Sequence, residues 1–312
     1  MRPLPALQNG DPVAIVAPAS PFDREKFGKG LVALRSLGLR PEYDDGLFAR
    51  HPVEHAYLAG PDDRRLAELR EALRGKGRAL VLARGGYGSL RLFLNNFPLT
   101  AAEVAAHPKL LVGYSDATVL HEIWGRAGVP SIHGPMCTQL GEEQGALERL
   151  RTLLFANRRP EPVLWNPLRP VGARGGKAEG ELRGGNLAVL ASLCGTPLQP
   201  KFAGAIVLLE DLNEPPYRLD RLVTQLILAG CFEGVRGVVV GDLFGPGEPS
   251  GGRADAVAGQ LARLGVPTVF GGPFGHSGRN QPVAFGCRHA LDADRGMLAP
   301  LESPTLRQDS IA

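Results

Sequence analysis

The fold follows from the stretch Leu110-Leu-Val-Gly-Tyr-Ser-Asp-Ala-Thr-Val-Leu-His121. A short apolar run, typical of a buried strand, ends at Gly113, and a helical pattern begins after Ser115. This strand–turn–helix pattern is typical of a nucleophile elbow, in which a serine is presented on a sharp turn. It departs from G-x-S-x-G because Ala117 replaces the second glycine. The alternative is that Ser115 only caps the helix, since serine is common at that position.

Further strand and helix patterns lie before this stretch. Ser20-Pro21 supplies the N-cap and first-turn proline of a predicted helix that ends at Gly38. Strands that alternate with helices predict a parallel sheet with helices on both faces. The other predicted elements are strands Val13–Ala17 and Ala79–Ala83 and a helix at Asp62–Leu73.

The second half contains more strand than the first. We expect an α/β fold, with an N-terminal parallel-sheet α/β sandwich over residues 1–160. Residues 161–175, rich in Pro, Gly and Arg, are the predicted linker. A smaller β-rich α/β domain is expected over residues 176–312. Its predicted elements are strands Ala205–Glu210, Gly237–Gly241 and Thr268–Gly271 and a helix at Pro216–Ala229.

Composition excludes several classes of partner and site. The formal net charge of +3 is too small to favour nucleic acid or a membrane surface. The opening residues lack the apolar core of a secretory signal, so we expect a cytoplasmic protein. The four cysteines (Cys137, Cys194, Cys231 and Cys287) lie far apart, which favours free buried thiols over disulfides or a zinc site. We expect neither a metal ion nor a cofactor.

Three other polar segments follow predicted strands. Ala83-Arg-Gly-Gly-Tyr-Gly-Ser89 could form one arm of an oxyanion hole, cradle a phosphate or be a plain tight turn. Glu210 ends an apolar strand, where ligands of α/β proteins tend to bind. His276 lies between glycines in a loop, and His133 is its rival as a catalytic base. With Ser115 as nucleophile, His276 would be the base and Glu210 the residue that orients it.

Seven segments together resemble the LD-carboxypeptidase family of serine peptidases, which includes the microcin C immunity peptidases. They cover residues 13 to about 290 in family order. They are Val-Ala-Ile-Val-Ala-Pro-Ala-Ser from Val13, Arg84-Gly-Gly-Tyr-Gly, Gly113-Tyr-Ser-Asp-Ala-Thr, His133-Gly-Pro-Met, Gly184-Gly-Asn-Leu, Leu209-Glu-Asp-Leu-Asn-Glu and Phe274-Gly-His.

The resemblance implies roles for individual residues. It assigns the catalytic triad to Ser115, Glu210 and His276, and the oxyanion hole to the backbone N–H groups of Gly86 and Asp116. The implied reaction releases terminal D-alanine from peptidoglycan tetrapeptides during cytoplasmic cell-wall recycling, and members are commonly homodimers. The candidate substrate contacts are Arg84, Tyr87 and Asn186.

Several alternatives stay open. Any of Arg84, Arg183 and Arg218 could bind the terminal carboxylate of the substrate, since arginine suits that task. An immunity-type peptidase that cuts an aminoacyl-nucleotide antibiotic would need an aromatic platform, but Trp124 and Trp165 lie outside the seven segments. A non-catalytic binding protein would use the cleft between the two domains.

Overall fold

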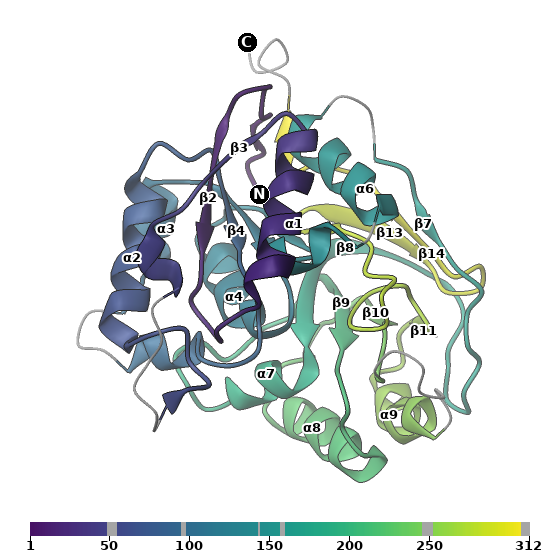
Figure 1. Ribbon diagram of the computed structural model, residues 1–312. Helices are drawn as coiled ribbons and strands as arrows, with labels where there is room; N and C mark the ends of the chain where they lie inside the picture. Colours follow the sequence, from purple (N-terminus) through teal and green to yellow (C-terminus); the bar gives the residue numbers. More distant parts are fainter. Residues whose placement is uncertain (49–54, 95–97, 143, 157–159, 245–251, 307–312) are drawn as a thin grey trace. The chain divides into compact units, whose positions relative to one another are not determined.

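The computed structural model describes residues 1–48, 55–94, 98–142, 144–156, 160–244 and 252–306 (Figure 1). Contacts divide the chain into two units. The first comprises Met1–Arg159 together with the stretch from Pro304, and the second comprises Pro160–Ser303.

A parallel sheet forms the centre of the first unit. Its strands lie in the order β6-β5-β4-β2-β3, and every neighbouring pair is parallel. All residues of β4 and β5 are buried, as expected for strands covered on both faces by helices. The strands are β1 (Leu4–Pro5), β2 (Pro12–Val16), β3 (Arg40–Glu42), β4 (Ala79–Leu82), β5 (Leu110–Gly113), β6 (Ser131–His133) and β15 (Thr305–Leu306). The helices are α1 (Arg24–Ser36), α2 (Asp62–Arg74), α3 (Ala101–Ala106), α4 (Thr118–Arg126), α5 (Cys137–Leu140) and α6 (Gln144–Phe155).

The strand order of this sheet reverses at β2, because β3 lies on one side of β2 and β4 on the other. Ligands of open α/β sheets bind outside the carboxyl ends of the strands at such a reversal. The topology therefore predicts that a ligand site of this sheet lies at the loops that follow β2, β4 and β5.

The second unit contains a mixed sheet. Strands β8 to β11 are parallel, and β13, β14 and β7 extend the sheet from β8 as antiparallel neighbours. The strands of this sheet are β7 (Val163–Leu164), β8 (Lys177–Asn186), β9 (Ala205–Glu210), β10 (Gly237–Val240), β11 (Thr268–Phe270), β13 (Arg288–Asp292) and β14 (Met297–Pro300). Strand β12 (Val283–Phe285) also belongs to the second unit but is not part of this sheet. The helices are α7 (Leu187–Ser192), α8 (Pro216–Leu228) and α9 (Arg253–Leu261).

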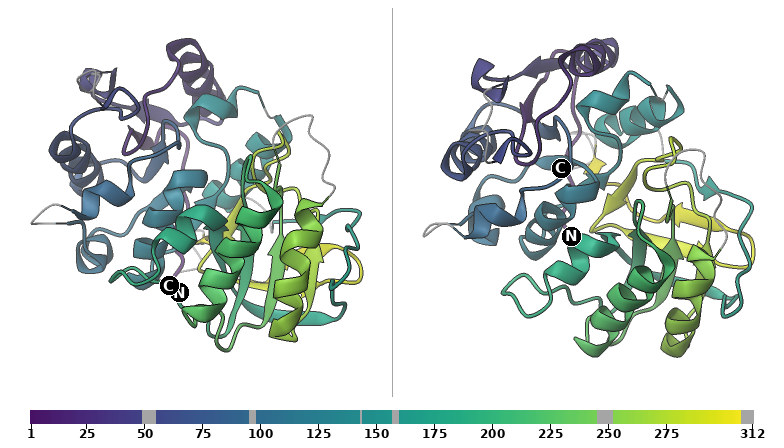
Figure 2. Two further views of the ribbon diagram at one scale, coloured as in Figure 1. Left: turned by 90° about the horizontal axis from the view of Figure 1, so that it is seen from below. Right: turned by 60° about the horizontal axis from the view of Figure 1, so that its bottom comes forward.

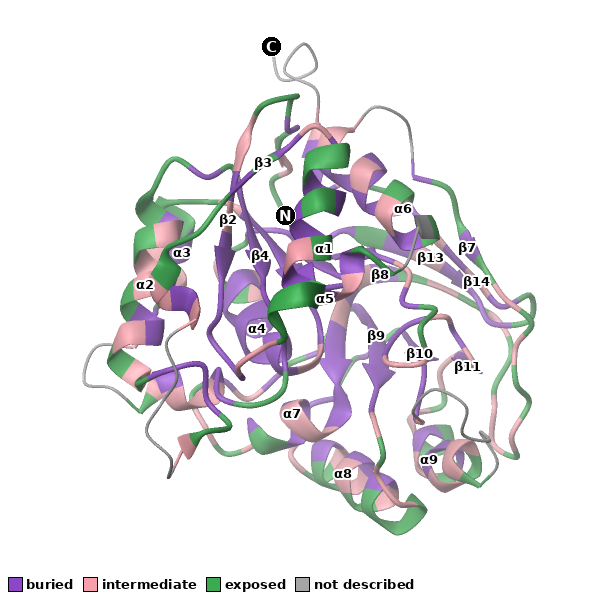
Figure 3. Ribbon diagram, in the orientation of Figure 1, coloured by how far each residue is buried: buried purple, intermediate pink, exposed green. Residues whose placement is uncertain are grey.

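Strand β9 separates two apolar layers of the second unit. Ala205, Val207 and Leu209 pack in one cluster with residues of α7, α8 and α9, which lie along one face of the sheet (Figure 2). Ile206 and Leu208 point to the other face and pack with residues of β12, β13 and β14. Colouring by burial shows the same arrangement, with buried strands and helices exposed on their outer faces (Figure 3).

The predicted α/β fold class, with a parallel N-terminal sheet and a second sheet domain, is confirmed. One helix start was wrong: Asp23, not Ser20, caps α1 by accepting a hydrogen bond from the Lys26 N–H at 2.8 Å. The predicted linker contains β7, which pairs with β14. The C-terminal residues Thr305 and Leu306 pair with β1 and so belong to the first unit, whereas the sequence placed them in the second.

All four cysteines are free thiols, and three of them are buried. Burial raises the pKa of Cys137 and of Cys287 to about 12, which makes both thiols inert at neutral pH. Among the described residues, no helix combines the length and the apolar composition that crossing a membrane requires.

Leu208→Ala tests the central role of β9. Because Leu208 is completely buried, its truncation should lower the free energy of unfolding by about 3 kcal/mol, from lost burial and a residual cavity. Leu228→Ala is the control, since Leu228 is 82% exposed at the end of α8 and should change stability by less than about 0.5 kcal/mol. Urea unfolding measures both, and equal effects would contradict the assignment of the core.

Candidate active site

Ser115 lies on a strained turn directly after β5. Its φ of 62° is in the left-handed region, which residues other than glycine rarely adopt and which is concentrated at functional sites. Tyr114 is the N-cap of the short 3₁₀ turn Ser115–Ala117, and Ala117 is the N-cap of α4. Ser115 therefore does not cap a helix, and this finding argues against the alternative drawn from the sequence.

The alanine at the end of the G-x-S-x-A pattern fits this turn. A side chain at Gly113 would place its Cβ 3.1 Å from the Ala117 Cβ and 3.3 Å from Leu82. The missing side chain of Gly113 thus leaves room for the methyl group of Ala117. A second glycine is not required here, because Ala117 has an ordinary helical φ of −60°.

The loop after β4, residues 84–89 and called the glycine loop below, packs against the serine. A Cβ added to Gly85 would lie 3.1 Å from the Ser115 Cβ and 3.3 Å from its Oγ. From the loop after β2, the Ser20 Oγ accepts a hydrogen bond from the Tyr87 N–H at 3.0 Å, and the Ser20 N–H donates to the Gly85 carbonyl at 3.2 Å. Three neighbouring strands therefore bring together Ser20, the glycine loop and Ser115, as the reversal of strand order predicts.

The two predicted oxyanion donors belong to these loops. Gly86 is an exposed residue of the glycine loop. Asp116 is in the first turn after β5, where backbone N–H groups have no partner within the helix. Gly86 follows Gly85 and Asp116 follows Ser115, and Gly85 lies so close to Ser115 that a side chain there would crowd it. A shared role of the two N–H groups in binding an oxyanion remains a prediction.

In the second unit, Glu210 and His276 form a hydrogen-bonded pair. The Nδ1 of His276 lies 2.7 Å from the Oε2 of Glu210. Glu210 is the last residue of β9 and is completely buried, and its Oε1 has no hydrogen-bond partner among the described residues. Because a carboxylate accepts, the Nδ1 of His276 carries the proton, and its Nε2 is then the acceptor that a general base requires.

The charges around His276 determine its protonation. Burial lowers the pKa of the imidazole, but the carboxylates of Glu210, Asp211 and Asp242 raise it, and the net shift is upward from 6.5. The imidazolium that forms when His276 accepts a proton is thereby stabilised. This is the behaviour expected of a general base beside a buried carboxylate.

Asp242 holds the loop that carries His276, and the sequence analysis missed it. Its Oδ2 accepts a hydrogen bond from the Ser277 N–H at 3.0 Å, and its Oδ1 pairs with Arg279 at 3.3 Å. Gly275 lets the loop approach closely, since a Cβ there would lie 3.1 Å from both the Asp242 Cβ and the Glu210 Oε2. The only sequence signal for Asp242 was an acid directly after the strand Gly237–Gly241.

Asn186 and Asp211 form a second polar pair at this edge of the sheet. The Asn186 side chain caps α7 by accepting from the Val189 N–H at 3.1 Å, and its Nδ2 lies 3.3 Å from the Asp211 Oδ1. Burial, with the negative charge of Glu210, raises the pKa of Asp211 to about 7. The amide of Asn186 therefore has structural partners at both ends, and its contact with substrate remains a prediction.

The three candidate arginines have different partners. Arg84 is exposed on the glycine loop, and its Nη1 donates to the Pro21 carbonyl at 2.8 Å. Arg183 donates to the Lys201 carbonyl at 2.8 Å, and Arg218 pairs with Glu214 at 3.1 Å. Arg84 is thus the one whose loop contacts Ser115. Tyr87, also on this loop, is 51% exposed and lies 5.8 Å from the ring of Tyr57.

Two histidines near Ser115 are structural. His133, the rival base, lies in β6 with no exposed surface, and its ring packs 5.7 Å from that of Tyr114. His121 on α4 binds the Gly113 carbonyl through Nε2 at 2.9 Å and the Ser131 Oγ through Nδ1 at 2.8 Å. Because the carbonyl can only accept, Nε2 carries the proton, and His121 is neutral with a pKa lowered to about 4 by burial.

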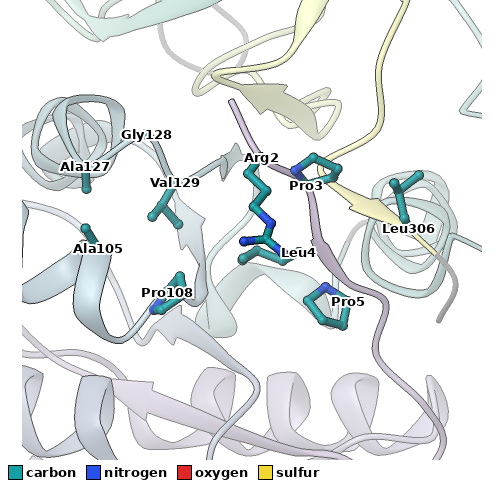
Figure 4. Close-up of a pocket in the computed structure, with 10 residues that line it drawn as sticks. All are labelled: Arg2, Pro3, Leu4, Pro5, Ala105, Pro108, Ala127, Gly128, Val129 and Leu306. Atoms are coloured by element: carbon teal, nitrogen blue, oxygen red, sulfur yellow. The ribbon is translucent and has the colours of Figure 1, made fainter. Parts of the chain in front are cut away.

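Neither a metal cluster nor the pocket of the first unit involves these groups in the described part of the chain. No set of three or more His, Cys, Asp or Glu side chains in that part of the chain is arranged to hold a metal ion. A pocket of 510 Å³ lies in the first unit among β1, β15 and the ends of α3 and α4 (Figure 4). Apolar side chains and Arg2 line it, and none of the predicted site residues does.

Comparison with known proteins finds a family match for each half of the chain. Residues 13–134 match the LD-carboxypeptidase N-terminal domain, and residues 179–291 match the LD-carboxypeptidase C-terminal domain. The murein tetrapeptide carboxypeptidase of Pseudomonas aeruginosa is 32% identical over 298 residues, which is 91% of this chain and 94% of that protein.

Solved structures agree with these matches. The muramoyltetrapeptide carboxypeptidase of Oxalobacter formigenes has a TM-score of 0.75 at 28% identity, over 92% of this chain and 97% of its own. The microcin C7 self-immunity protein MccF has a TM-score of 0.81 over 98% of this chain and 100% of its own. Its sequence identity is only 21%, so this likeness concerns the fold alone.

His121 should make stability depend on pH. Between pH 6.5 and about 4 the unfolded chain binds a proton at this residue and the folded chain does not. The free energy of unfolding should therefore fall as the pH is lowered through this range, by up to about 3 kcal/mol from this residue. His121→Gln should lose that part of the pH dependence in urea unfolding at several pH values. His107→Gln, a change at an exposed histidine, should keep it, and identical profiles for the two variants would contradict the prediction.

Proposed function

Because the chain belongs to the LD-carboxypeptidase family of peptidases, we propose that it is a serine carboxypeptidase that releases terminal D-alanine from peptidoglycan tetrapeptides. The conformation of Ser115 carries this proposal. A serine at φ 62° between a buried strand and a helix, with no capping role, has the geometry of a nucleophile. The substrate class is taken from the names of the Pseudomonas and Oxalobacter relatives.

The mechanism assigns one step to each residue. The Nε2 of His276 accepts the proton of the Ser115 hydroxyl as Oγ attacks the carbonyl carbon of the scissile amide. The backbone N–H groups of Gly86 and Asp116 donate hydrogen bonds to the oxyanion of the tetrahedral intermediate. His276 then protonates the nitrogen of D-alanine, which leaves, and water hydrolyses the remaining acyl-enzyme by the same route.

Glu210 orients the base throughout these steps. Its hydrogen bond to Nδ1 holds the imidazole in the tautomer that exposes a basic Nε2, and its charge stabilises the imidazolium. The mechanism requires the Nε2 of His276, in the second unit, to come within hydrogen-bond distance of the Ser115 Oγ, in the first. Arg84 is the proposed contact for the carboxylate of D-alanine because its loop contacts the serine.

A peptidase acting on an aminoacyl-nucleotide antibiotic is the second candidate. The expected tryptophan platform has little support, since Trp124 is completely buried and the Trp165 indole N–H donates to the Phe270 carbonyl at 3.0 Å. The half-exposed pair Tyr57 and Tyr87 is the observation that favours it, because aromatic rings beside the glycine loop could stack on a nucleobase.

For the carboxypeptidase we also expect a homodimer that acts in cytoplasmic cell-wall recycling. Sedimentation velocity tests whether the protein is a dimer.

Ser115→Ala should abolish release of D-alanine from a muropeptide tetrapeptide, measured by mass spectrometry. Loss of the nucleophile should reduce kcat by at least about 10⁴-fold. Ser192→Ala, at an exposed serine of α7, should retain full activity. Release that persists in Ser115→Ala excludes this nucleophile. An aminoacyl sulfamoyl adenosine assayed alongside separates the two candidates, and cleavage of that compound alone would favour the second.

Glu210→Gln should change the pH dependence of catalysis. In the unchanged protein kcat/KM should rise with pH through a pKa above 6.5, because His276 must be neutral to act as a base. Removing the negative charge of Glu210 should move this limb to lower pH, and loss of the correct tautomer should reduce the plateau by about 10⁴-fold. The control is Glu233→Gln, at an exposed glutamate. A limb that stays in place in Glu210→Gln would remove Glu210 from the mechanism.

A further inference from the structure

One peptide group of the glycine loop is held at both ends by buried, oppositely charged side chains. The carbonyl of Gly88 accepts a hydrogen bond from the Nη1 of Arg65 at 3.0 Å. The N–H of Ser89, in the same peptide plane, donates to the Oδ2 of Asp116 at 2.8 Å. A cation thus binds the negative end of this peptide dipole and a carboxylate binds its positive end.

Arg65 reaches this peptide from α2 and is completely buried. Fully buried arginines are rare, because each needs partners that replace water around its charge. Its Nε donates to the Gly60 carbonyl at 3.0 Å, Nη1 also binds the Pro18 carbonyl after β2, and Nη2 pairs with Asp62. One side chain therefore connects the loops that follow β2 and β4.

Asp116 reaches the same peptide from the turn that carries Ser115. Only 4% of this residue is exposed. Burial raises the pKa of its carboxyl, while hydrogen bonds from Ser89 and Gly88 and the charge of Arg65 oppose that rise. Asp116 is the residue after the proposed nucleophile, and its own N–H is one of the two proposed oxyanion donors.

The held peptide is close to the other oxyanion donor along the chain. Gly86 precedes Gly88 by two residues, and between them the Tyr87 N–H donates to the Ser20 Oγ at 3.0 Å. Gly85, on the other side of Gly86, contacts Ser115. The Gly88–Ser89 peptide and the Tyr87–Ser20 hydrogen bond are therefore the two anchors on the C-terminal side of Gly86.

We propose that Arg65 and the side chain of Asp116 are positioning residues that hold the glycine loop so that both oxyanion donors point to one place. The inference rests on the proposed serine mechanism. An oxyanion hole acts only if its donors are aimed where charge develops in the transition state. A displacement of about 1 Å can cost about 100-fold in rate, while substrate in the ground state binds as before.

Asp116→Asn and Arg65→Met test the inference by steady-state kinetics. The first change keeps an acceptor oxygen without the negative charge, and the second keeps a buried unbranched stem without donors. Each should lower kcat by about 10- to 100-fold and leave KM within about twofold. Because both act on one peptide, the double variant should lose less than the product of the single losses. Arg91→Gln is the matched control, since Arg91 also pairs with Asp62, at 2.9 Å, and should keep kcat within about twofold.

Hydrogen exchange of the segment 84–92 provides a second measurement. In both variants the amide protons of this segment should exchange faster, and those of the rest of the chain should exchange at the unchanged rate. If Arg65→Met fails to fold, Asp116→Asn alone decides the question. Wild-type kcat in folded Asp116→Asn, or a rise in KM equal to the loss in kcat, would overturn the inference. If the unchanged protein releases no D-alanine and a fluorophosphonate does not label Ser115, the proposed function fails. Exchange of 84–92 then still decides whether the two charges hold the loop, and an unchanged rate would show that they do not.

Discussion

The left-handed backbone of Ser115 is the constraint on which the first unit's site depends. Such a conformation costs about 1–3 kcal/mol in a residue with a side chain, and it persists only where the surroundings impose it. Here the buried strand β5 ends on one side and α4 begins on the other. The missing side chain of Gly113 and the hydrogen bond from His121 to the Gly113 carbonyl complete the support. Ser115 therefore lies on a turn that is fixed by the buried strand before it and the helix after it.

Buried charges organise the loops at the carboxyl edges of both sheets. In the first unit, Arg65 and Glu68 on α2 bind backbone groups of the loop after β2, with the Ala17 N–H 2.7 Å from the Glu68 Oε1. In the second unit, Asp242 binds the backbone beside His276. Each charge loses water on burial and recovers hydrogen bonds only if the loop keeps one conformation.

A buried charge also determines the protonation of His276, the proposed base. Glu210 is fully buried at the end of β9, where its Oε2 accepts a hydrogen bond from the Nδ1–H of His276, while its Oε1 has no hydrogen-bond partner among the described residues. A carboxylate in that position raises the pKa of the imidazole against the effect of burial. The position at which β9 ends therefore sets the charge that faces the proposed base.

Local patterns predicted the elements well. The strands Leu110–Gly113 and Ala205–Glu210 were predicted with the bounds that the structure has, because short apolar runs ended at a glycine or an acid. The sequence also named Glu210 as the partner of His276, from an acid at a strand end, a histidine in a glycine-flanked loop and the order of the family segments, and the structure brings the two together across 66 residues. Ser20 was misassigned as a helix cap, since a serine before a proline carries the same local signal whether its hydroxyl binds its own helix or the distant Tyr87.

The sequence by itself thus determined the α/β class and the strand ends, and it named the residues that we propose for acyl transfer. Only the tertiary structure decided that Ser115 does not cap a helix, that Asp242 supports the histidine loop and that Arg65 and Asp116 hold one peptide. The physical reason is the separation, along the sequence, of the residues that interact. Hydrophobic periodicity and turn residues depend on about ten neighbouring residues of the sequence. The hydrogen-bond partners of a buried charge lie in loops that are distant in the sequence and that the strand order brings next to it.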